Sequence, residues 1–201
     1  MRNATDAILV IDVQNDFCPG GALAVTGGDE IVGPINALVP EFPVRVFTQD
    51  WHPGDHSSFA SQHEGQAPMS VTEMPYGPQV LWPDHCVIGS TGAALHSRLD
   101  ARSADLIIRK GFRREIDSYS AFFENDHATS TGLEGYLRSR GVENVTLVGL
   151  ATDFCVNYSA QDAAALGFGV TVVESLCRAI DFDGSLTAAK TAMSAAGVTF
   201  G

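Results

Sequence analysis

Five apolar runs rich in β-branched residues recur along the chain and predict strands. They cover residues 7–11, 44–48, 106–108, 145–148 and 170–173, and a weaker run at residues 198–200 closes the chain. Continuous runs of this kind are typical of strands covered on both faces, as in a parallel sheet. The pattern therefore predicts six strands in the interior of the molecule.

Segments with helical spacing lie between most of these runs. Apolar residues within 133–137 repeat at i, i+3 and i+4, and Gly141 supplies a C-terminal stop. Residues 31–38 and 154–166 are also expected to be helical, and Asp183 is expected to cap a last helix. Strands that alternate with helices predict an α/β protein: a Rossmann-like three-layer α/β/α sandwich with a mostly parallel six-stranded sheet.

Length and charge limit what such a protein can be. The 201 residues fit a single domain over residues 1–201, and the 45% hydrophobic content is that of an ordinary globular protein. The net charge of −12 argues against binding to nucleic acid or to an anionic membrane surface. No apolar run reaches the ~18 residues of a membrane span and no signal peptide is evident, so a cytoplasmic protein is expected. The sequence leaves open whether the protein is a monomer or a homo-oligomer.

One cysteine stands where a nucleophile is expected. Sites in parallel sheets lie beyond the carboxyl ends of the strands, and Cys155 follows residues 145–148 after a turn of small residues. At a helix start, free N–H groups and the helix dipole lower the pKa of a thiol and favour the thiolate. The alternative is a small buried hydrophobic residue, as most free cysteines are. Cys18, Cys86 and Cys177 show no CxxC spacing, so neither a disulfide framework nor a cysteine zinc site is expected.

Two charged residues at other strand ends could activate this thiol. Asp12 follows the first strand, where burial would raise its pKa and suit it to accept the thiol proton. Lys110 follows the third strand and is the matching counter-ion. Asp12 could instead cap a turn, and Lys110 could be a solvated lysine. Their shared position at strand ends, together with Cys155, favours a catalytic group.

A long irregular stretch, residues 49–90, carries a second set of candidate residues. Loops of this length in a compact domain are usually functional. Asp50 and His52 are spaced i, i+2, so in an extended strand end they can point the same way, and His85 closes the same stretch. One carboxylate and two imidazoles suit an open, catalytic Zn²⁺, Fe²⁺ or Mn²⁺ site. The alternative is a polar, histidine-rich loop that binds nothing.

Motifs along the whole chain resemble the isochorismatase-like cysteine hydrolase superfamily. They are IDVQNDF at residues 11–17, KG at residues 110–111 and GLATDFCV at residues 149–156. The resemblance implies a catalytic triad of Asp12, Lys110 and Cys155. It also implies an oxyanion hole formed by the backbone N–H groups of Ala151 and Cys155, and a cis peptide between Leu150 and Ala151.

Two further segments, DWH at residues 50–52 and WPDHC within residues 82–86, resemble the nicotinamidase branch of that superfamily. The branch implies one divalent transition metal on Asp50, His52 and His85. Zinc is the first expectation, with iron or manganese as alternatives. Some members also use the histidine that matches His56, whereas others have waters there, and the sequence leaves both open.

Three aromatic residues match positions that wall the pocket of this branch. They are Phe17, Trp82 and Tyr119, all in expected loops beside the candidate catalytic residues. Aromatic side chains more often belong to the core. In a pocket, however, a flat pyridine ring would stack well between them.

The resemblance implies an enzyme whose partner is the small molecule nicotinamide. It would hydrolyse nicotinamide to nicotinic acid and ammonia through a cysteine thioester, as a step of NAD salvage, and would also accept pyrazinamide. Another amidohydrolase of the superfamily, acting on a carbamoyl or ureido compound, would share the triad without needing Asp50, His52 and His85. An isochorismatase would not need Cys155. A non-enzymatic binding protein would be expected to have lost part of the triad.

Overall fold

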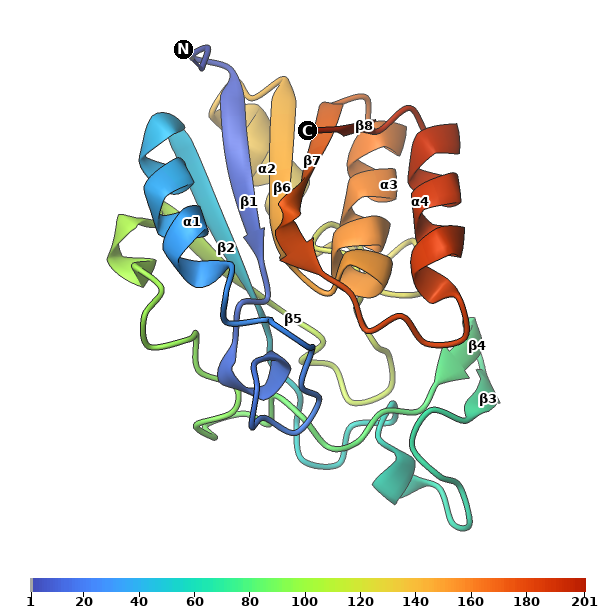
Figure 1. Cartoon of the computed structure of the whole chain (residues 1–201). Helices are drawn as coiled ribbons and strands as arrows, with labels where there is room; N and C mark the ends of the chain where they lie inside the picture. The colour runs from blue at the N-terminus through green and yellow to red at the C-terminus, as the bar shows by residue number, and fades with distance from the viewer. Residues whose placement is uncertain (1) are drawn as a thin grey trace.

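A six-stranded parallel sheet forms the centre of the protein in the computed structural model, which describes residues 2–201 (Figure 1). In spatial order the strands are β5 (Leu106–Lys110), β2 (Val44–Asp50), β1 (Asp6–Ile11), β6 (Asn144–Leu150), β7 (Gly169–Arg178) and β8 (Thr199–Phe200). Every neighbouring pair is parallel. The six predicted strands and the parallel sheet are therefore confirmed.

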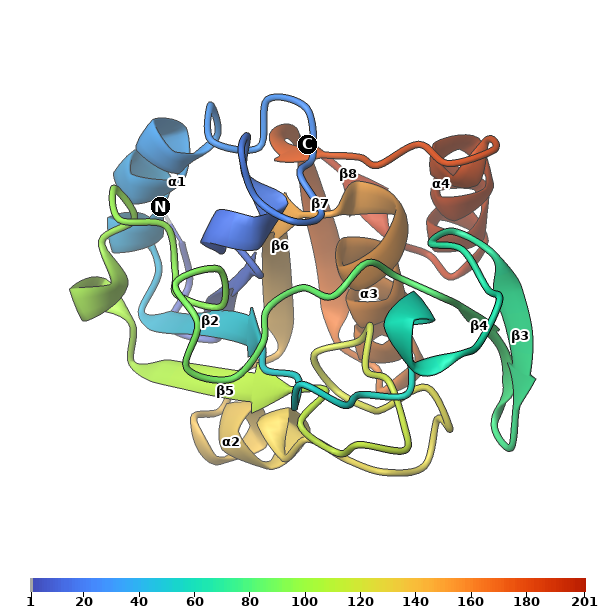
Figure 2. The same cartoon turned by 90° about the horizontal axis from the view of Figure 1, so that it is seen from below.

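Helices cover both faces of the sheet, which gives the predicted three-layer sandwich. α1 (Val32–Leu38) lies on one face, and α2 (Leu133–Ser139), α3 (Asn157–Ala165) and α4 (Ser185–Ala195) lie on the other (Figures 1 and 2). Successive residues of β1 point to opposite faces: Ile8 packs in the core beneath α1, whereas Leu9 packs in the core beneath the other three helices. Within residues 2–201 no helix is long and apolar enough to cross a membrane.

The strand order changes direction between β1 and β6. From β1 the chain moves outward through β2 to β5, and it then returns to the other side of β1 to form β6, β7 and β8. Open α/β sheets bind their ligands at such a switch point, beyond the carboxyl ends of the strands. Asp12 directly follows β1, and Cys155 lies in the turn that follows β6.

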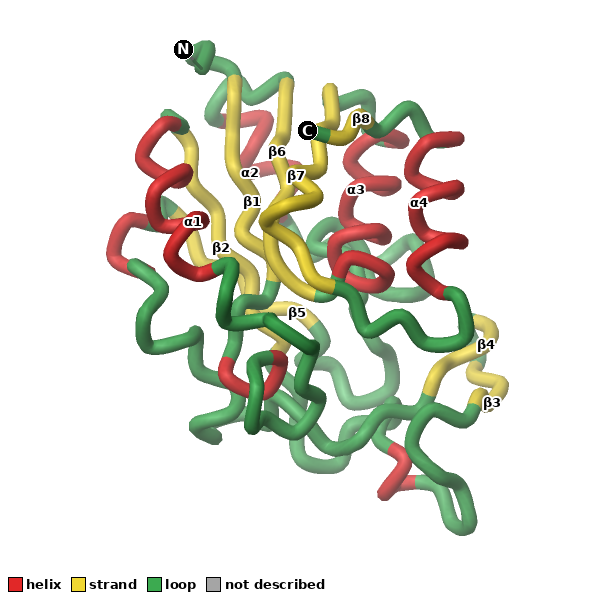
Figure 3. Tube along the Cα trace, viewed as in Figure 1, coloured by secondary structure: helices red, strands yellow, loops and turns green. Residues whose placement is uncertain are grey.

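Loops and turns cover the carboxyl ends of the strands (Figure 3). The sequence predicted only an irregular loop over residues 49–90, but the structure forms an antiparallel hairpin there, β3 (Val71–Met74) with β4 (Gly77–Val80). The hairpin is short and its first strand is largely exposed, so it lacks the long apolar run that marks a buried strand.

The structure corrects one predicted helix start and refines another. Asp183 does not cap α4: it has a positive φ of 49°, and Gly184 occupies the N-cap position. Asp153 instead accepts a hydrogen bond from the hydroxyl of Ser185 (2.5 Å). The helix predicted over residues 154–166 is present, but its first turn, residues 152–156, is π-helical and the α-helix proper begins at Asn157.

Candidate active site

Asp12, Lys110 and Cys155 meet at the switch point between β1 and β6. Lys110 Nζ lies 2.9 Å from Asp12 Oδ2 and 3.5 Å from Cys155 Sγ, and the carboxylate of Asp12 lies within 4.8 Å of that sulfur. All three side chains are buried. The structure thus brings together the three residues of the predicted triad, although Lys110 comes from edge strand β5, two strands away from Asp12.

Hydrogen bonds fix the orientation of Asp12. Its backbone is held at a φ of 45°, its N–H donates to Thr48 Oγ1 (3.0 Å), and the same hydroxyl donates to Asp12 Oδ1 (2.5 Å). The second carboxylate oxygen is left to face Lys110. This arrangement presents one oxygen to the lysine and the thiol while the other is anchored to β2.

Lys110 is a fully buried cation between two carboxylates. Its ammonium group donates to Asp50 Oδ1 (2.5 Å) and to the backbone carbonyl of Ser118 (2.8 Å), besides facing Asp12. Burial alone lowers the pKa of Lys110, but the adjacent carboxylates of Asp12 and Asp50 outweigh it and hold that pKa well above its usual value. Lys110 therefore stays charged and links the triad to Asp50.

Cys155 is a thiol at rest, which corrects the expectation of a lowered pKa. Burial raises the pKa of Cys155 well above 9.0, and the opposing effect of Lys110 does not compensate for it. The π-helical turn also differs from the regular helix start on which the expectation depended. The thiol therefore needs a base beside it when it reacts, and Asp12 is placed to serve as one.

Two glycines permit the close approach of the site's segments. At Gly149, with a φ of 121°, a Cβ atom would lie 2.1 Å from the carbonyl oxygen of Ile11 on β1. At Gly111, with a φ of 66°, it would lie 2.4 Å from Cε1 of the His52 ring. The peptide between Leu150 and Ala151 is cis, as the resemblance implied.

Asp50, His52 and His85 form a group of ligands beside the triad. One ligand atom from each lies within 4.8 Å of the others. The Nδ1 atoms of His52 and His85 each lie 2.8 Å from a backbone carbonyl, of Gly111 and Pro83 respectively. Since a carbonyl only accepts, both Nδ1 atoms carry the proton, and both Nε2 atoms keep a free lone pair. His52 Nε2 lies 3.8 Å from Asp50 Oδ2.

The electrostatics of this group also suit a metal. Burial lowers the pKa of both His52 and His85 to about 4, so the imidazoles are neutral at physiological pH, as metal ligands must be. Burial raises the pKa of Asp50 to about 7 despite the nearby ammonium of Lys110. A cation at this position would favour the ionised carboxylate.

His56, the residue left open by the sequence, has no free ring nitrogen in the structure. Its Nδ1 lies 2.7 Å from Ser58 Oγ, and its Nε2 lies 3.2 Å from the carbonyl oxygen of Ile116. The carbonyl requires a proton on Nε2, so Nδ1 accepts from the serine hydroxyl. This pattern favours a site in which the other three residues hold the metal without His56.

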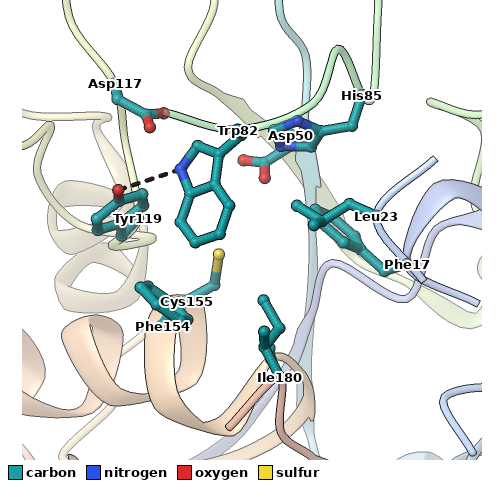
Figure 4. A pocket seen from close by; sticks show the side chains of 11 residues that line it. Phe17, Leu23, Asp50, Trp82, His85, Asp117, Tyr119, Phe154, Cys155 and Ile180 are labelled. Atoms are coloured by element: carbon teal, nitrogen blue, oxygen red, sulfur yellow. Dashed lines mark hydrogen bonds between the residues drawn. The ribbon is translucent and has the colours of Figure 1, made fainter. Parts of the chain in front are cut away.

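A cavity lined by Cys155 of the triad and by Asp50 and His85 of the metal-ligand group opens here (Figure 4). Its walls include the three aromatic residues predicted from the sequence, Phe17, Trp82 and Tyr119. Trp82 Nε1 donates to the hydroxyl of Tyr119 (3.1 Å), and the two rings meet edge to face at 79°. Phe17 packs against the ring of His85 with centroids 5.5 Å apart. The cavity therefore has flat apolar walls, and the thiol of Cys155 and the imidazole of His85 also line it.

Four residues that line the cavity were not assigned from the sequence: Leu23, Asp117, Phe154 and Ile180. Phe154 directly precedes Cys155, and that proximity was a usable signal. Leu23 and Ile180 are half-buried residues of irregular segments, which no periodicity marks. Asp117 is buried two residues before Tyr119, and its place depends on the β3–β4 hairpin, because Gln79 of β4 donates to it (2.9 Å).

Comparison with known proteins agrees with this geometry. The isochorismatase domain model matches residues 6–200. A nicotinamidase of Acinetobacter baylyi is 56% identical over 199 residues, which cover 98% of this chain and 93% of that protein. The structure of an Acinetobacter baumanii nicotinamidase and pyrazinamidase superposes with a TM-score of 0.98 at 50% identity, covering 100% of this chain and 97% of the other. A Pyrococcus horikoshii pyrazinamidase, solved in complex with zinc, superposes with a TM-score of 0.78 at 31% identity, covering 98% of each chain.

Proposed function

The chain belongs to the isochorismatase family, and from this premise we propose that it is an amidase that hydrolyses nicotinamide to nicotinic acid and ammonia, and pyrazinamide likewise. One observation carries the proposal: Cys155 of the triad and Asp50 and His85 of the metal-ligand group line the same aromatic-walled cavity. A cysteine amidase without a ring to bind needs no such metal site. The relatives named nicotinamidase and pyrazinamidase support the same substrate class.

In the proposed reaction Asp12 moves the proton and Cys155 forms the bond. Asp12 takes the proton of the thiol as the sulfur attacks the carboxamide carbon. The backbone N–H groups of Ala151 and Cys155 stabilise the negative charge on the carboxamide oxygen. Asp12 then returns the proton to the nitrogen as the C–N bond breaks, so that ammonia departs and a thioester remains on Cys155. A water next gives one proton to Asp12 while its oxygen attacks the thioester carbon. The C–S bond breaks and Asp12 returns the proton to the sulfur, which yields the acid and the free thiol.

Lys110 stabilises the negative charges that form on Asp12 and Cys155 during these proton transfers. Its ammonium lies 2.9 Å from the carboxylate oxygen of Asp12 and 3.5 Å from the sulfur of Cys155. It therefore stabilises Asp12 as an anion before the proton transfer and stabilises developing charge on the sulfur during it. Because its pKa is held high, Lys110 itself does not serve as the acid.

The donor set fits a divalent transition metal, with Asp50, His52 and His85 as its ligands. Three protein ligands with further positions open are typical of catalytic sites. When bound, the metal supplies a Lewis acid that holds the ring nitrogen of the substrate. We propose zinc, by analogy with the Pyrococcus horikoshii pyrazinamidase, with iron and manganese as alternatives. Phe17, Trp82 and Tyr119 would then hold the faces and edges of the ring.

An assay of ammonia release tests this function. Purified protein is given nicotinamide, pyrazinamide or a ureido compound, with and without a chelator. We expect turnover of both aromatic amides, inhibition by the chelator and its reversal by added zinc. Turnover of the ureido compound alone, unaffected by the chelator, would instead identify an amidohydrolase for carbamoyl or ureido substrates. Production of nicotinic acid would place the protein in NAD salvage.

A further inference from the structure

Asp117 is a buried carboxylate that lines the cavity, and its basic neighbours are two histidines rather than a lysine or an arginine. Its Oδ1 accepts the N–H of Ser118 (2.8 Å), and its Oδ2 accepts from Gln79 Nε2 (2.9 Å). None of the ion pairs formed by residues 2–201 involves Asp117. A buried anion with hydrogen bonds but no cation is costly, and such groups are normally paired or bound to metals.

The surroundings of Asp117 point to a metal as that cation. A carboxylate oxygen of Asp117 and ring nitrogens of His52 and His56 all lie within 4.8 Å of one another. His52 also belongs to the group with Asp50 and His85, so the two groups share one imidazole. Both nitrogens of His56 are already hydrogen-bonded, and each has only one site. Each carboxylate oxygen of Asp117 accepts one hydrogen bond and keeps a second lone pair, so Asp117 is the member of the second group that can add a ligand oxygen. Asp117 and His85 lie at the end of the cavity away from Ile180 (Figure 4).

The composition of the buried site supports the same conclusion. It brings together three carboxyl groups, those of Asp12, Asp50 and Asp117, and one amine, that of Lys110. A divalent cation bound among them would balance this excess of acidic groups and would favour the ionised form of each carboxyl group.

We propose that Asp117 is the second carboxylate of the metal centre, supplying an anionic oxygen to the divalent cation or to a water bound on it. Gln79, brought in by the β3–β4 hairpin, positions this carboxylate. The inference rests on the metal of the proposed function but not on the amide reaction. The proposal also explains what the β3–β4 hairpin does: it supports the metal centre through Gln79, whereas none of the triad contacts described above involves it.

Zinc affinity tests the proposal without using activity. Protein stripped by a chelator is titrated with zinc against a chromogenic chelator, as wild type, Asp117→Asn and the control Glu115→Gln. The control removes the same charge two residues away, from a side chain that is 76% exposed. We expect zinc affinity to fall about 10- to 100-fold in Asp117→Asn, the range for groups that support a metal site, and to stay within about twofold in the control. An unchanged affinity in Asp117→Asn would overturn the proposal.

Melting temperatures separate this role from a merely structural one. Zinc should raise the melting temperature of Asp117→Asn by less than it raises that of wild type, each protein being compared with its own metal-free form. A merely structural role would lower the melting temperature with and without zinc alike and leave that gain unchanged, which would overturn the proposal. A variant that does not fold without metal would overturn it too. A wild-type protein that binds no zinc, iron or manganese would instead refute the metal of the proposed function.

Discussion

Replacing Lys110 by methionine removes the one cation that holds two buried carboxylates together. Methionine is similar in length to lysine and keeps the apolar stem, so the change removes mainly the charge. In the wild type the ammonium lies 2.9 Å from Asp12 Oδ2 and 2.5 Å from Asp50 Oδ1, and its side chain is wholly inaccessible to solvent. The variant leaves both carboxylates, and the carbonyl of Ser118, without this partner.

The expected loss is large because neither carboxylate can turn to water. Breaking a buried ion pair by removing one partner costs about 3–5 kcal/mol. The loss should depend on pH with a definite sign. The ammonium lowers the pKa of Asp50, so its removal raises the folded pKa further above the unfolded value near 3.8. A carboxyl with a raised folded pKa stabilises the fold at low pH and loses that contribution as the pH rises. The deficit of Lys110→Met should therefore be larger at pH 8 than at pH 5.

Urea unfolding of metal-free protein measures this loss. The matched control is Lys190→Met at the chain's only other lysine, which pairs with Glu174 at 2.5 Å with both side chains partly exposed. That control should change the free energy of unfolding by less than about 1 kcal/mol. Lys110→Met should also lower kcat at least about a hundredfold, the scale of acid–base contributions. A Lys110→Met protein as stable as the Lys190→Met control at pH 8 would refute the buried counter-ion.

Three further predictions address the nucleophile, the imidazoles and the turn that carries the cysteine. Cys155→Ala should abolish ammonia release while leaving the fold intact, because no other group can form the thioester; clear residual turnover would exclude covalent catalysis by this residue. Since burial lowers the pKa of His52 and His85 to about 4, metal-free protein should lose stability as the pH falls from about 6.5 to 4, where the unfolded chain takes up protons that the folded imidazoles do not. Asp50, whose pKa burial raises to about 7, holds one proton in the folded state over this range and offsets only one of the two imidazoles. Melting temperatures that stay constant over that window would contradict their neutral, buried state. Asp153→Ala removes the acceptor of hydrogen bonds from two backbone N–H groups and from the hydroxyl of Ser185, and should lower the free energy of unfolding by about 2–4 kcal/mol in urea titrations. A change of a few tenths would mean that water replaces those bonds without loss.

The sheet could be predicted because its strands are covered on both faces. Burial on two sides demands continuous apolar runs, and these remain visible in a single sequence. The strand-end rule then placed Asp12, Asp50, Lys110 and Cys155 at one edge before any contact was known. Spacing and loop composition already suggested a carboxylate and two imidazoles as metal ligands, whereas the aromatic walls depended on the family resemblance, since their segments meet only in the folded chain.

What the sequence did not predict depends on tertiary contacts. The carboxylate of Asp117 is positioned by Gln79, which lies 38 positions away on a hairpin without a long apolar run. The sequence predicted that the pKa of Cys155 is lowered, because a helix start favours the thiolate. In the structure the pKa is raised, because burial has the larger effect and no local sequence pattern reveals it. The failed cap at Asp183 has a similar origin: Asp153, from a distant turn, binds the start of α4 instead.

The comparison of nicotinamide with benzamide tests the central claim most directly. Benzamide keeps the carboxamide and the ring that Phe17, Trp82 and Tyr119 would hold, and it lacks only the ring nitrogen proposed to bind the metal. A site built around a specific polar contact rejects an analogue without it far more strongly than an apolar pocket does. We predict that kcat/KM for ammonia release falls at least about a hundredfold for benzamide. Comparable values for the two amides would contradict a metal that holds the ring, and with it the assignment of nicotinamide as the substrate.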